Sequence, residues 1–163
     1  MGKKNGFSLI EILIVVGILG LISTLLITAL GSTRIKARDT KRKSDLNQIG
    51  RFLTLSCFLP ETGGGDYDLS QIVTGIISRY PQYAQYVPKN IKDPKTGTDT
   101  ETRYHYLVTS DGQACALYAN LENDEEKVTL TNINLPTAHG GTGIFQTSAV
   151  GWNGSNKYFQ ISN

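Results

Sequence analysis

The chain has 163 residues, and its 16 Lys and Arg against 14 Asp and Glu give a formal net charge of +2 at neutral pH. This length suits one soluble domain behind one apolar helix, and the nearly balanced charge does not indicate a dedicated nucleic-acid-binding protein. Two cysteines, Cys57 and Cys115, are too few for a metal cage but are compatible with one disulfide in an exported domain.

The first predicted element is an apolar helix from Phe7 to Leu30. Glu11 is the one ionisable side chain in this stretch, which as an α-helix would extend for about 36 Å, enough to cross a bilayer core of about 30 Å. A secretory signal peptide would show a small-residue cleavage site after the apolar region, whereas Ala29-Leu30-Gly31 leads directly into a charged helical pattern. We therefore expect this helix to remain attached as a membrane anchor.

Glu11 is the unusual residue of this span, because a carboxylate inside a membrane helix costs about 2.5 to 3.5 kcal/mol unless it has a partner. One interpretation is a shallow Glu11 that is protonated or snorkels to the interface. The other is a charge pair, since cleavage between Gly6 and Phe7 would create an α-amine on Phe7 one helical turn before Glu11. Such a pair would neutralise two charges in lipid, within one chain or between neighbouring chains.

The string Lys3-Lys4-Asn5-Gly6, followed by Phe7-Ser8-Leu9-Ile10-Glu11 and an apolar run, resembles the N-terminal signature of type IV pilins and type II secretion pseudopilins. The resemblance implies that a prepilin peptidase cleaves after Gly6 and methylates the amine of Phe7. It also implies that the apolar helices pack into a filament core, with Glu11 in assembly, on an inner-membrane platform driven by a cytoplasmic ATPase. Many relatives carry a proline in the second half of this span, and this chain has none there.

The helical pattern continues beyond the span, because no proline occurs before Pro60 and apolar residues recur on one side of the helix at Ile35, Leu46, Ile49, Phe52, Leu53 and Cys57. We predict one long helix from about Ser8 to about Leu59. The chain then divides into a leader (1–6), a transmembrane or filament-core helix (7–31), an amphipathic half-helix (32–59) and a globular head (60–163).

A basic run follows the span, at Arg34, Lys36, Arg38, Lys41, Arg42 and Lys43. Positive-charge counting alone would keep the C-terminal part in the cytoplasm. The resemblance implies the opposite orientation: a single-pass cytoplasmic-membrane protein before assembly, in contact with the lipid bilayer, and then a periplasmic or cell-surface filament. We interpret the run as a solvated helix face; the alternatives are contact with anionic lipid headgroups and charge pairing between subunits.

The head is predicted to combine a short helix with a small antiparallel sheet. Residues 61–67 read as a flexible turn, and Leu69–Tyr80 as a helix capped by Asp68 or Ser70 and stopped by Pro81. Asp111-Gly112 is a strong hairpin signal, and a two-residue turn there pairs three sets of residues on the face toward the helix: Val108 with Cys115, Tyr106 with Leu117, and Tyr104 with Ala119. We expect a third strand at 127–132 and sheet contacts from Trp152 and 157–161, which gives an α+β pilin fold.

The two cysteines are expected to face each other between helix and sheet. Cys57 extends the stripe of Ile49 and Leu53, and Cys115 lies on the hairpin face that carries Leu117. A disulfide would close a loop of roughly 60 residues and stabilise the fold by about 4 kcal/mol on the chain-entropy model. Two buried free thiols are the alternative.

Catalytic and ligand-binding signals are weak throughout the head. The Asp93-Pro94 sequence favours a turn, the acidic segment 122–126 favours a solvated turn over a calcium site, and the glycine-rich 139–143 lacks the Lys-Ser or Lys-Thr of a phosphate loop. No zinc-protease, hydrolase or paired-cysteine motif occurs, so we expect no enzymatic activity, catalytic residue, cofactor or metal.

The predicted function is that of a structural filament subunit serving adhesion, motility, DNA uptake or protein secretion, which leaves binding of nucleic acid open. The alternative is a membrane-anchored single-span protein with a small extracytoplasmic binding domain. Cleavage after Gly6 together with multimerisation distinguishes the two, because an ordinary anchor requires neither.

Overall fold

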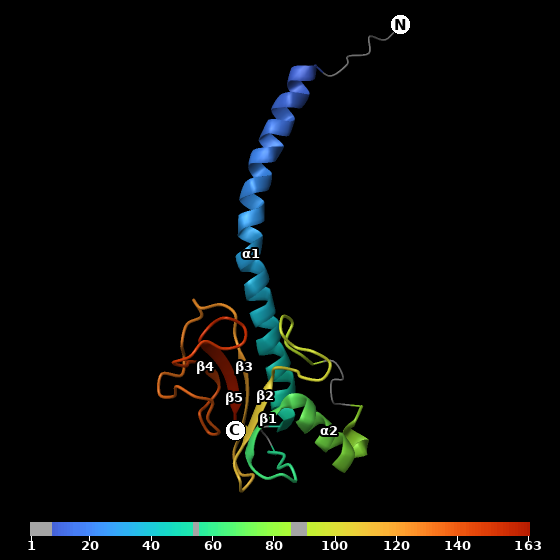
Figure 1. Cartoon of the computed structure of the whole chain (residues 1–163), viewed down its shortest axis with the longest axis vertical. Helices are drawn as coiled ribbons and strands as arrows, with labels where there is room; N and C mark the ends of the chain where they lie inside the picture. The colour runs from blue at the N-terminus through green and yellow to red at the C-terminus, as the bar shows by residue number, and fades with distance from the viewer. Residues whose placement is uncertain (1–7, 54–55, 86–90) are drawn as a thin grey trace. The chain divides into compact units, whose positions relative to one another are not determined.

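The structure is a computed structural model that describes residues 8–53, 56–85 and 91–163, without the side chains of residues 25–29 and 83. The chain divides into two compact units, Met1–Ile35 and Lys36–Asn163, and helix α1 (Leu9–Leu53) runs through the boundary between them. The second unit combines helices with a five-stranded antiparallel sheet (Figure 1), which confirms the predicted fold class.

Within the second unit, α1 buries one face. Leu46, Ile49 and Leu53 recur at helical spacing and are all buried. The helix ends at Leu53 rather than near Leu59: residues 54–55 lie outside the described residues, and residues 56–60 are not helical. Instead of an intrahelical bond, the backbone N–H of Phe58 donates to the phenol oxygen of Tyr106 at 2.8 Å, so the sheet takes over a donor that a longer helix would have used.

The sheet has the strand order β1-β2-β3-β5-β4, and every neighbouring pair is antiparallel. Its strands are β1 (Gly65–Asp68), β2 (His105–Val108), β3 (Cys115–Asn120), β4 (Gly143–Gln146) and β5 (Lys157–Ser162). The last strand in the sequence therefore lies inside the sheet, between β3 and β4. The predicted contribution of 157–161 to the sheet is confirmed.

The β2–β3 hairpin has the predicted register, since Tyr106 pairs with Leu117 and Val108 with Cys115. The connection is longer than the predicted two-residue turn. The N–H of Thr109 donates to the carbonyl of Ala114 at 3.0 Å, which leaves four residues between them, and the N–H of Gly112 donates to the carbonyl of Thr109 at 2.9 Å. Gly112 has a backbone φ of 67°, a conformation that residues with a Cβ rarely adopt.

Two strands were not predicted. β1 falls in the predicted flexible turn 61–67, and β4 follows the glycine-rich segment, whereas 127–132 forms no strand. In place of a third strand, the backbone N–H groups of Thr129 and Leu130 both donate to the carbonyl of Ile144, at 2.8 and 2.9 Å, along the outer edge of β4. Both missed strands lack the alternating apolar pattern and form because a neighbouring strand offers partners for their backbone groups.

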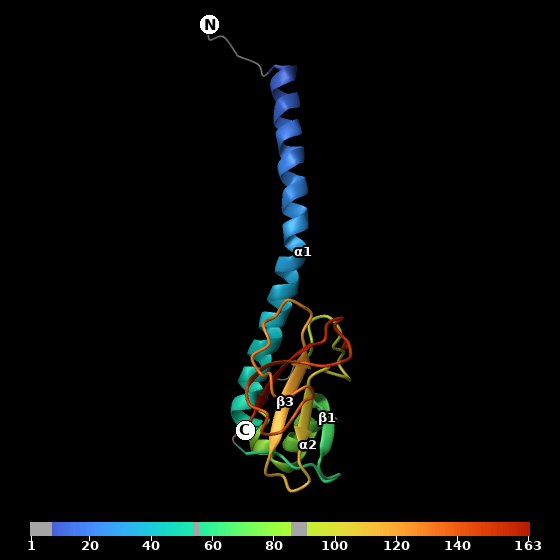
Figure 2. The ribbon, with the colours of Figure 1, turned by 90° about the vertical axis from the view of Figure 1, so that its left-hand side faces the viewer.

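Helix α2 (Leu69–Arg79) is confirmed with Asp68 as its cap, because the Asp68 carboxylate accepts the N–H of Ser70 at 2.9 Å. A short 3₁₀ turn, η1 (Pro81–Tyr83), follows it. Figures 1 and 2 show the sheet beside the C-terminal part of α1, with α2 near β1 and β2. The inner core lies between these layers and contains Leu46, Ile49, Leu69, Ile72, Tyr106, Leu117 and Ile161, among others.

A second core covers the other face of the sheet. Tyr118, Phe145 and Tyr158 are buried there under side chains from the connecting loops: Leu130, Ile133 and Trp152. The ring of His105 stacks on those of Tyr118 and Trp152, with centroids 5.1 Å from each. The sheet is therefore buried on both faces, which explains why every residue of β3 is buried.

Candidate functional site

The N-terminal segment carries the residues that sequence reasoning selected. Gly6 and Phe7 lie outside the described residues, whereas Glu11 lies in the first turn of α1. The Glu11 carboxylate accepts the backbone N–H of Ser8 at 3.1 Å, and the N–H of Glu11 donates to the carbonyl of Ser8 at 3.0 Å. Ser8-x-x-Glu11 is thus half of a capping box, a sequence pattern that predicts the start of a helix.

This contact gives Glu11 a role inside its own chain. A carboxylate at the third position of a helix satisfies a backbone donor that the helix leaves free and interacts favourably with the positive end of the helix dipole. One N–H leaves most of the acceptor capacity of a carboxylate unused. Glu11 can therefore cap its helix and still accept a cation.

Beyond Glu11, the first unit presents an apolar surface. The large apolar side chains of α1 from Leu9 to Ile22 are about half exposed or more, and Leu9 reaches 83%. The hydroxyl groups in this stretch are satisfied internally, since Ser23 donates to the carbonyl of Leu19 at 2.7 Å and Thr24 to that of Leu21 at 2.8 Å. An apolar surface of this length marks an interaction site with lipid or protein, because a soluble monomer rarely leaves so much apolar area in water.

Among the residues that the structure describes, no helix has the length and apolar character needed to cross a membrane. The predicted span 7–31 includes Phe7 and the side chains of 25–29, which lie outside the described set.

In the second unit, the basic run is not a uniformly solvated face, and that interpretation is wrong for Arg42. Arg42 is fully buried and donates to Asp93 through Nε (2.7 Å) and Nη2 (2.9 Å), and to Asp39 through Nη1 (2.6 Å). Asp39 in turn accepts the backbone N–H groups of Glu122 and Asn123, both at 2.9 Å. These charge-assisted bonds join α1 to two loops of the head.

The acidic segment 122–126 is likewise only partly the solvated turn that was predicted. The carboxylate of Glu122 accepts hydrogen bonds from Nε and Nη2 of Arg38, at 2.8 and 2.7 Å, and one of its oxygens lies 3.2 Å from Nζ of Lys95. The hydrogen bond from Arg38, which outweighs burial, lowers the pKa of Glu122 to about 2. At the other end of the segment, Glu126 pairs with Lys43 at 2.9 Å.

Asp93 is the residue that sequence reasoning missed. Besides Arg42, its carboxylate accepts the backbone N–H groups of Lys95 and Thr96 and the side-chain amide of Asn153, at 2.8, 3.0 and 2.7 Å. Asn153 itself is buried, which disfavours glycosylation at Asn153-Gly154-Ser155, a sequence that fits the acceptor pattern by spacing. The bonds to Lys95 and Thr96 form the turn expected at Asp93-Pro94, but nothing local indicates a partner on α1.

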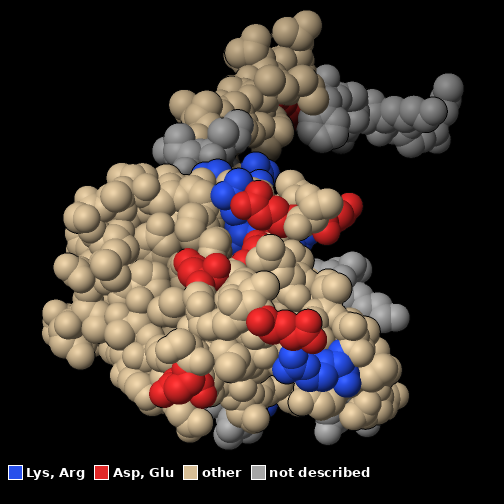
Figure 3. Space-filling model, turned by 60° about the horizontal axis from the view of Figure 1, so that its bottom comes forward, with Lys and Arg blue, Asp and Glu red and all other residues tan. Residues whose placement is uncertain are grey.

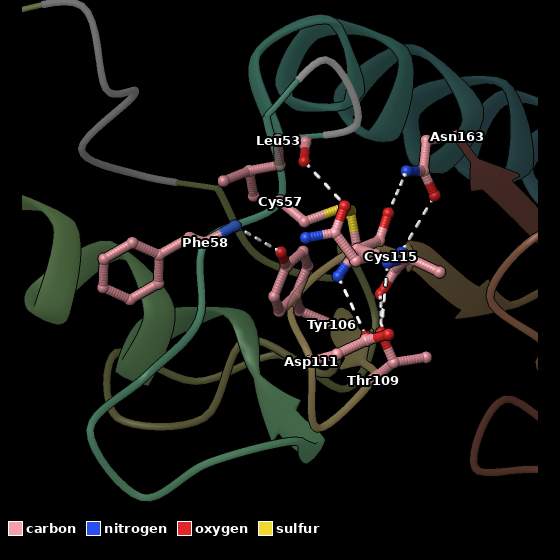
Figure 4. Close-up of a disulfide and its surroundings, with 10 residues drawn as sticks. Leu53, Cys57, Phe58, Tyr106, Thr109, Asp111, Cys115 and Asn163 are labelled. Carbon is pink, nitrogen blue, oxygen red and sulfur yellow. Dashed lines mark hydrogen bonds between the residues drawn. A yellow bond between two sulfur atoms is a disulfide. The ribbon is translucent and has the colours of Figure 1, made fainter.

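Cys57 and Cys115 form a disulfide between the segment after α1 and strand β3 (Figure 4). Cys115 is fully buried, and its Sγ lies 3.1 Å from the carbonyl oxygen of Leu53. The side chain of Asn163 continues the arrangement, accepting the N–H of Cys115 at 2.9 Å and donating to the carbonyl of Gln113 at 2.9 Å. The end of α1, the hairpin and the last residue of the chain are thereby held together.

Further candidates for a functional site in the head are a metal centre, a charged surface and a pocket. Within the described residues, no group of three or more His, Cys, Asp and Glu side chains is arranged to hold a metal ion. On the face drawn in Figure 3, charged side chains form small separate groups, some of which contain both basic and acidic residues. A 550 Å³ pocket between α2 and 58–62 is lined by Phe58, Tyr67 and Arg79, among others, but Arg79 already stacks on Phe58, 5.0 Å from its ring centre.

Comparison with known proteins identifies the N-terminal segment. Residues 1–27 match the protein family described as the prokaryotic N-terminal methylation motif, which is the prepilin-like signature of type IV pilins and pseudopilins. No curated protein and no solved structure matches the chain.

Proposed function

We propose that this chain, which carries the prepilin-like N-terminal signature, is a structural subunit of a type IV pilus or pseudopilus filament and not an enzyme. The observation that supports this most directly is the methylation motif at 1–27, which leads into a helix with an exposed apolar surface. The α+β head adds support, because a head docked on the second half of a long helix is the arrangement that the resemblance implies.

Processing is the first step of this function. A prepilin peptidase cleaves after Gly6 and methylates the new amine of Phe7, so the mature chain begins one residue before the capping residue Ser8. Before assembly, the apolar part of α1 anchors the subunit in the cytoplasmic membrane with the head outside the cytoplasm.

Assembly is explained by the charges of two groups, the amine of Phe7 and the carboxylate of Glu11. The amine of Phe7 and the carboxylate of Glu11 are both costly in an apolar medium, and each lowers the cost of the other when they meet. A pair within one chain would recruit no further subunit, whereas a pair between chains neutralises both charges and fixes the axial register. The platform and a cytoplasmic ATPase supply the force for extraction from the membrane.

The experiment that tests this function is intact-mass measurement of the protein from filament or membrane fractions. The expected mass corresponds to a chain that starts at N-methylated Phe7, and Gly6→Val should leave the leader attached. Assembled material that retains Met1 to Gly6 would contradict the proposal. Processed protein that remains monomeric would instead favour an anchored binding domain.

A further inference from the structure

In the second unit, helix α1 carries both of its carboxylates on its buried face. Its two carboxylates there, Asp39 and Asp45, are 1% and 3% exposed and are used internally, Asp39 by Arg42 and Asp45 by Lys41 and Tyr104. The outward face near the end of the helix carries Asn47, Gln48, Arg51 and Phe52, all exposed. We call these four residues the outward patch.

Two residues of the outward patch, Arg51 and Phe52, have side chains that the described part of the head neither pairs nor covers. Arg51 forms no ion pair with any part of the chain that the structure describes, although all 14 Asp and Glu residues belong to that part. Phe52 is 61% exposed on a helix whose neighbouring Ile49 and Leu53 are buried. A single exposed apolar side chain is ordinary, but an aromatic ring beside an unpaired guanidinium is a composition enriched in protein interfaces.

The complementary charges lie in the 122–126 segment. Asp124 and Glu125 are exposed at its tip; Asp124 accepts only one long backbone hydrogen bond, 3.4 Å from Asn156, and Glu125 has no ion pair within the described residues. The flanking residues Glu122 and Glu126 are fixed to α1 by Arg38 and Lys43. The two free carboxylates are therefore presented on a segment anchored at both ends, at the level of 38–43 on the helix.

We propose that in the assembled filament the outward patch of one copy receives the Asp124–Glu125 tip of a second copy, with Arg51 paired to these carboxylates and Phe52 covered beside them. The inference rests on the proposed function, because it requires copies packed in parallel. Arg51 lies farther along α1 than the anchoring residues 38–43, so the two copies are offset along the helix axis by roughly 12 to 20 Å at 1.5 Å per residue. A second copy is the favoured occupant because the chain itself supplies both halves of the charge pair.

Charge reversal with rescue tests the contact in the full-length protein and its own cells. Arg51→Glu should reduce filament yield at least about fivefold, since a surface pair of this kind is worth up to about that factor and reversal adds repulsion. Asp124→Lys with Glu125→Lys should do the same, and the combination of all three changes should restore assembly. Glu61→Lys, a reversal at a side chain that is 91% exposed on another loop, is the matched control and should assemble normally.

Total protein and formation of the Cys57–Cys115 bond, read on non-reducing gels, confirm that each variant folds. Normal filaments from Arg51→Glu would overturn the inference and leave the proposed function intact. So would a defect in Arg51→Glu that is absent in the Asp124 and Glu125 variant, because Arg51 would then contact another partner, such as lipid headgroups. Absence of filaments from the wild type overturns the proposed function itself.

Zero-length carbodiimide cross-linking gives an independent readout. In an Arg51→Lys variant, the added amine should couple to Asp124 or Glu125 of a neighbouring copy and give a covalent dimer whose linked peptides are identified by mass spectrometry. Dimers joined from position 51 to a different carboxylate would overturn the assignment.

Discussion

Arg42 and Asp93 form a two-bond ion pair across 51 residues of sequence, and neither side chain has any exposed surface. The pair connects α1 to the loop before β2, and Asn153 joins the same carboxylate from the loop before β5. Three segments that are distant in the sequence therefore converge on one buried charge. The geometry is favourable because the planar guanidinium matches the two carboxylate oxygens.

Removing the buried guanidinium of Arg42 should strongly lower the free energy of unfolding. Arg42→Met leaves Asp93 and Asp39 buried without their cation, and loss of one partner of a buried pair costs about 3 to 5 kcal/mol. Chemical unfolding of the detergent-solubilised protein, followed by near-UV circular dichroism, measures this loss. Arg51→Met removes an exposed guanidinium from the same helix and should change the free energy of unfolding by less than about 0.5 kcal/mol. Equal effects of the two substitutions would contradict the role of Arg42.

Asp93 also predicts how stability depends on pH. Burial alone would raise its pKa, but hydrogen bonds from Arg42, Thr96, Asn153 and Lys95 outweigh burial and lower it from 3.8 to about 2. A carboxyl group with a lower pKa in the folded state contributes stability above its unfolded pKa and loses it as the pH falls. Between pH 3.8 and about 2, the Asp93 contribution of about 2 kcal/mol should therefore disappear.

Urea unfolding at a series of pH values measures this dependence. In Asp93→Asn the free energy of unfolding should be lower near neutral pH and should fall less steeply below pH 3.8. A wild-type slope that persists unchanged in Asp93→Asn would show that other carboxyl groups cause it.

The sequence was sufficient for the parts of the fold that local signals control. The long helix follows from an uninterrupted helical pattern, and the hairpin register follows from Asp111-Gly112, because a short turn fixes which residues face each other. The pairing of Cys57 with Cys115 agrees with the expectation, but its reason was partly wrong, because Cys57 lies beyond the end of α1 and not on its apolar stripe. Strands β1 and β4 escaped prediction because their backbone pairing depends on neighbours and not on their own residues.

The buried ion pairs around Arg42 also depend on partners that are distant in the sequence, so local patterns did not predict them. Arg42 stands in a basic run, and a run of that kind is usually solvated; its burial depends on Asp93, which no local pattern connects to it. A usable signal was present on the helix itself, since Asp39, Arg42 and Leu46 recur at helical spacing and therefore share a face with the apolar stripe. A charged residue that falls on the apolar face of a helix therefore indicates an internal ion pair, even where its neighbours in the sequence form a basic run that is typical of a solvated surface.

Calcium addition provides a third test, because the carboxylates that bond directly to α1 or its arginines already have protein cations. Glu122 is paired with Arg38 and Lys95, and Asp93 with Arg42. Neither calcium nor a chelator should therefore shift the thermal midpoint of the head appreciably, in contrast to a site whose carboxylates need a metal. Differential scanning calorimetry with calcium and then with EDTA makes the comparison. A rise in the midpoint with calcium that the chelator reverses would contradict this assignment.

The disulfide should contribute strongly to the stability of the head. It encloses a sequence separation of 58 residues, for which the chain-entropy model gives about 4 kcal/mol. Cys57→Ala with Cys115→Ala should lower the free energy of unfolding by that order, part of it from the small cavity at the buried Cys115 site. Peptide mapping without reductant should show the linked pair in native material. Two freely alkylated thiols there would refute the bond in the mature protein.

Glu11 allows two roles to be separated by substitution. In the single chain its carboxylate caps the helix through the N–H of Ser8, while in the filament it is proposed to pair with the Phe7 amine of a neighbour. Glu11→Gln keeps an oxygen that accepts the Ser8 N–H but removes the charge, whereas Glu11→Leu removes both. If charge pairing drives assembly, both variants should form few filaments, and both should be poorly incorporated when co-expressed with wild type.

The second unit should be unaffected, because Glu11 lies in the first. Normal folding of the head, judged by an unchanged unfolding midpoint, and normal cleavage after Gly6, judged by intact mass, are therefore required of both variants before assembly is scored. Filament yield, measured by shearing and immunoblotting, then decides between the roles. Wild-type yield from Glu11→Gln with loss only in Glu11→Leu would assign Glu11 to helix capping, because the uncharged amide would then suffice.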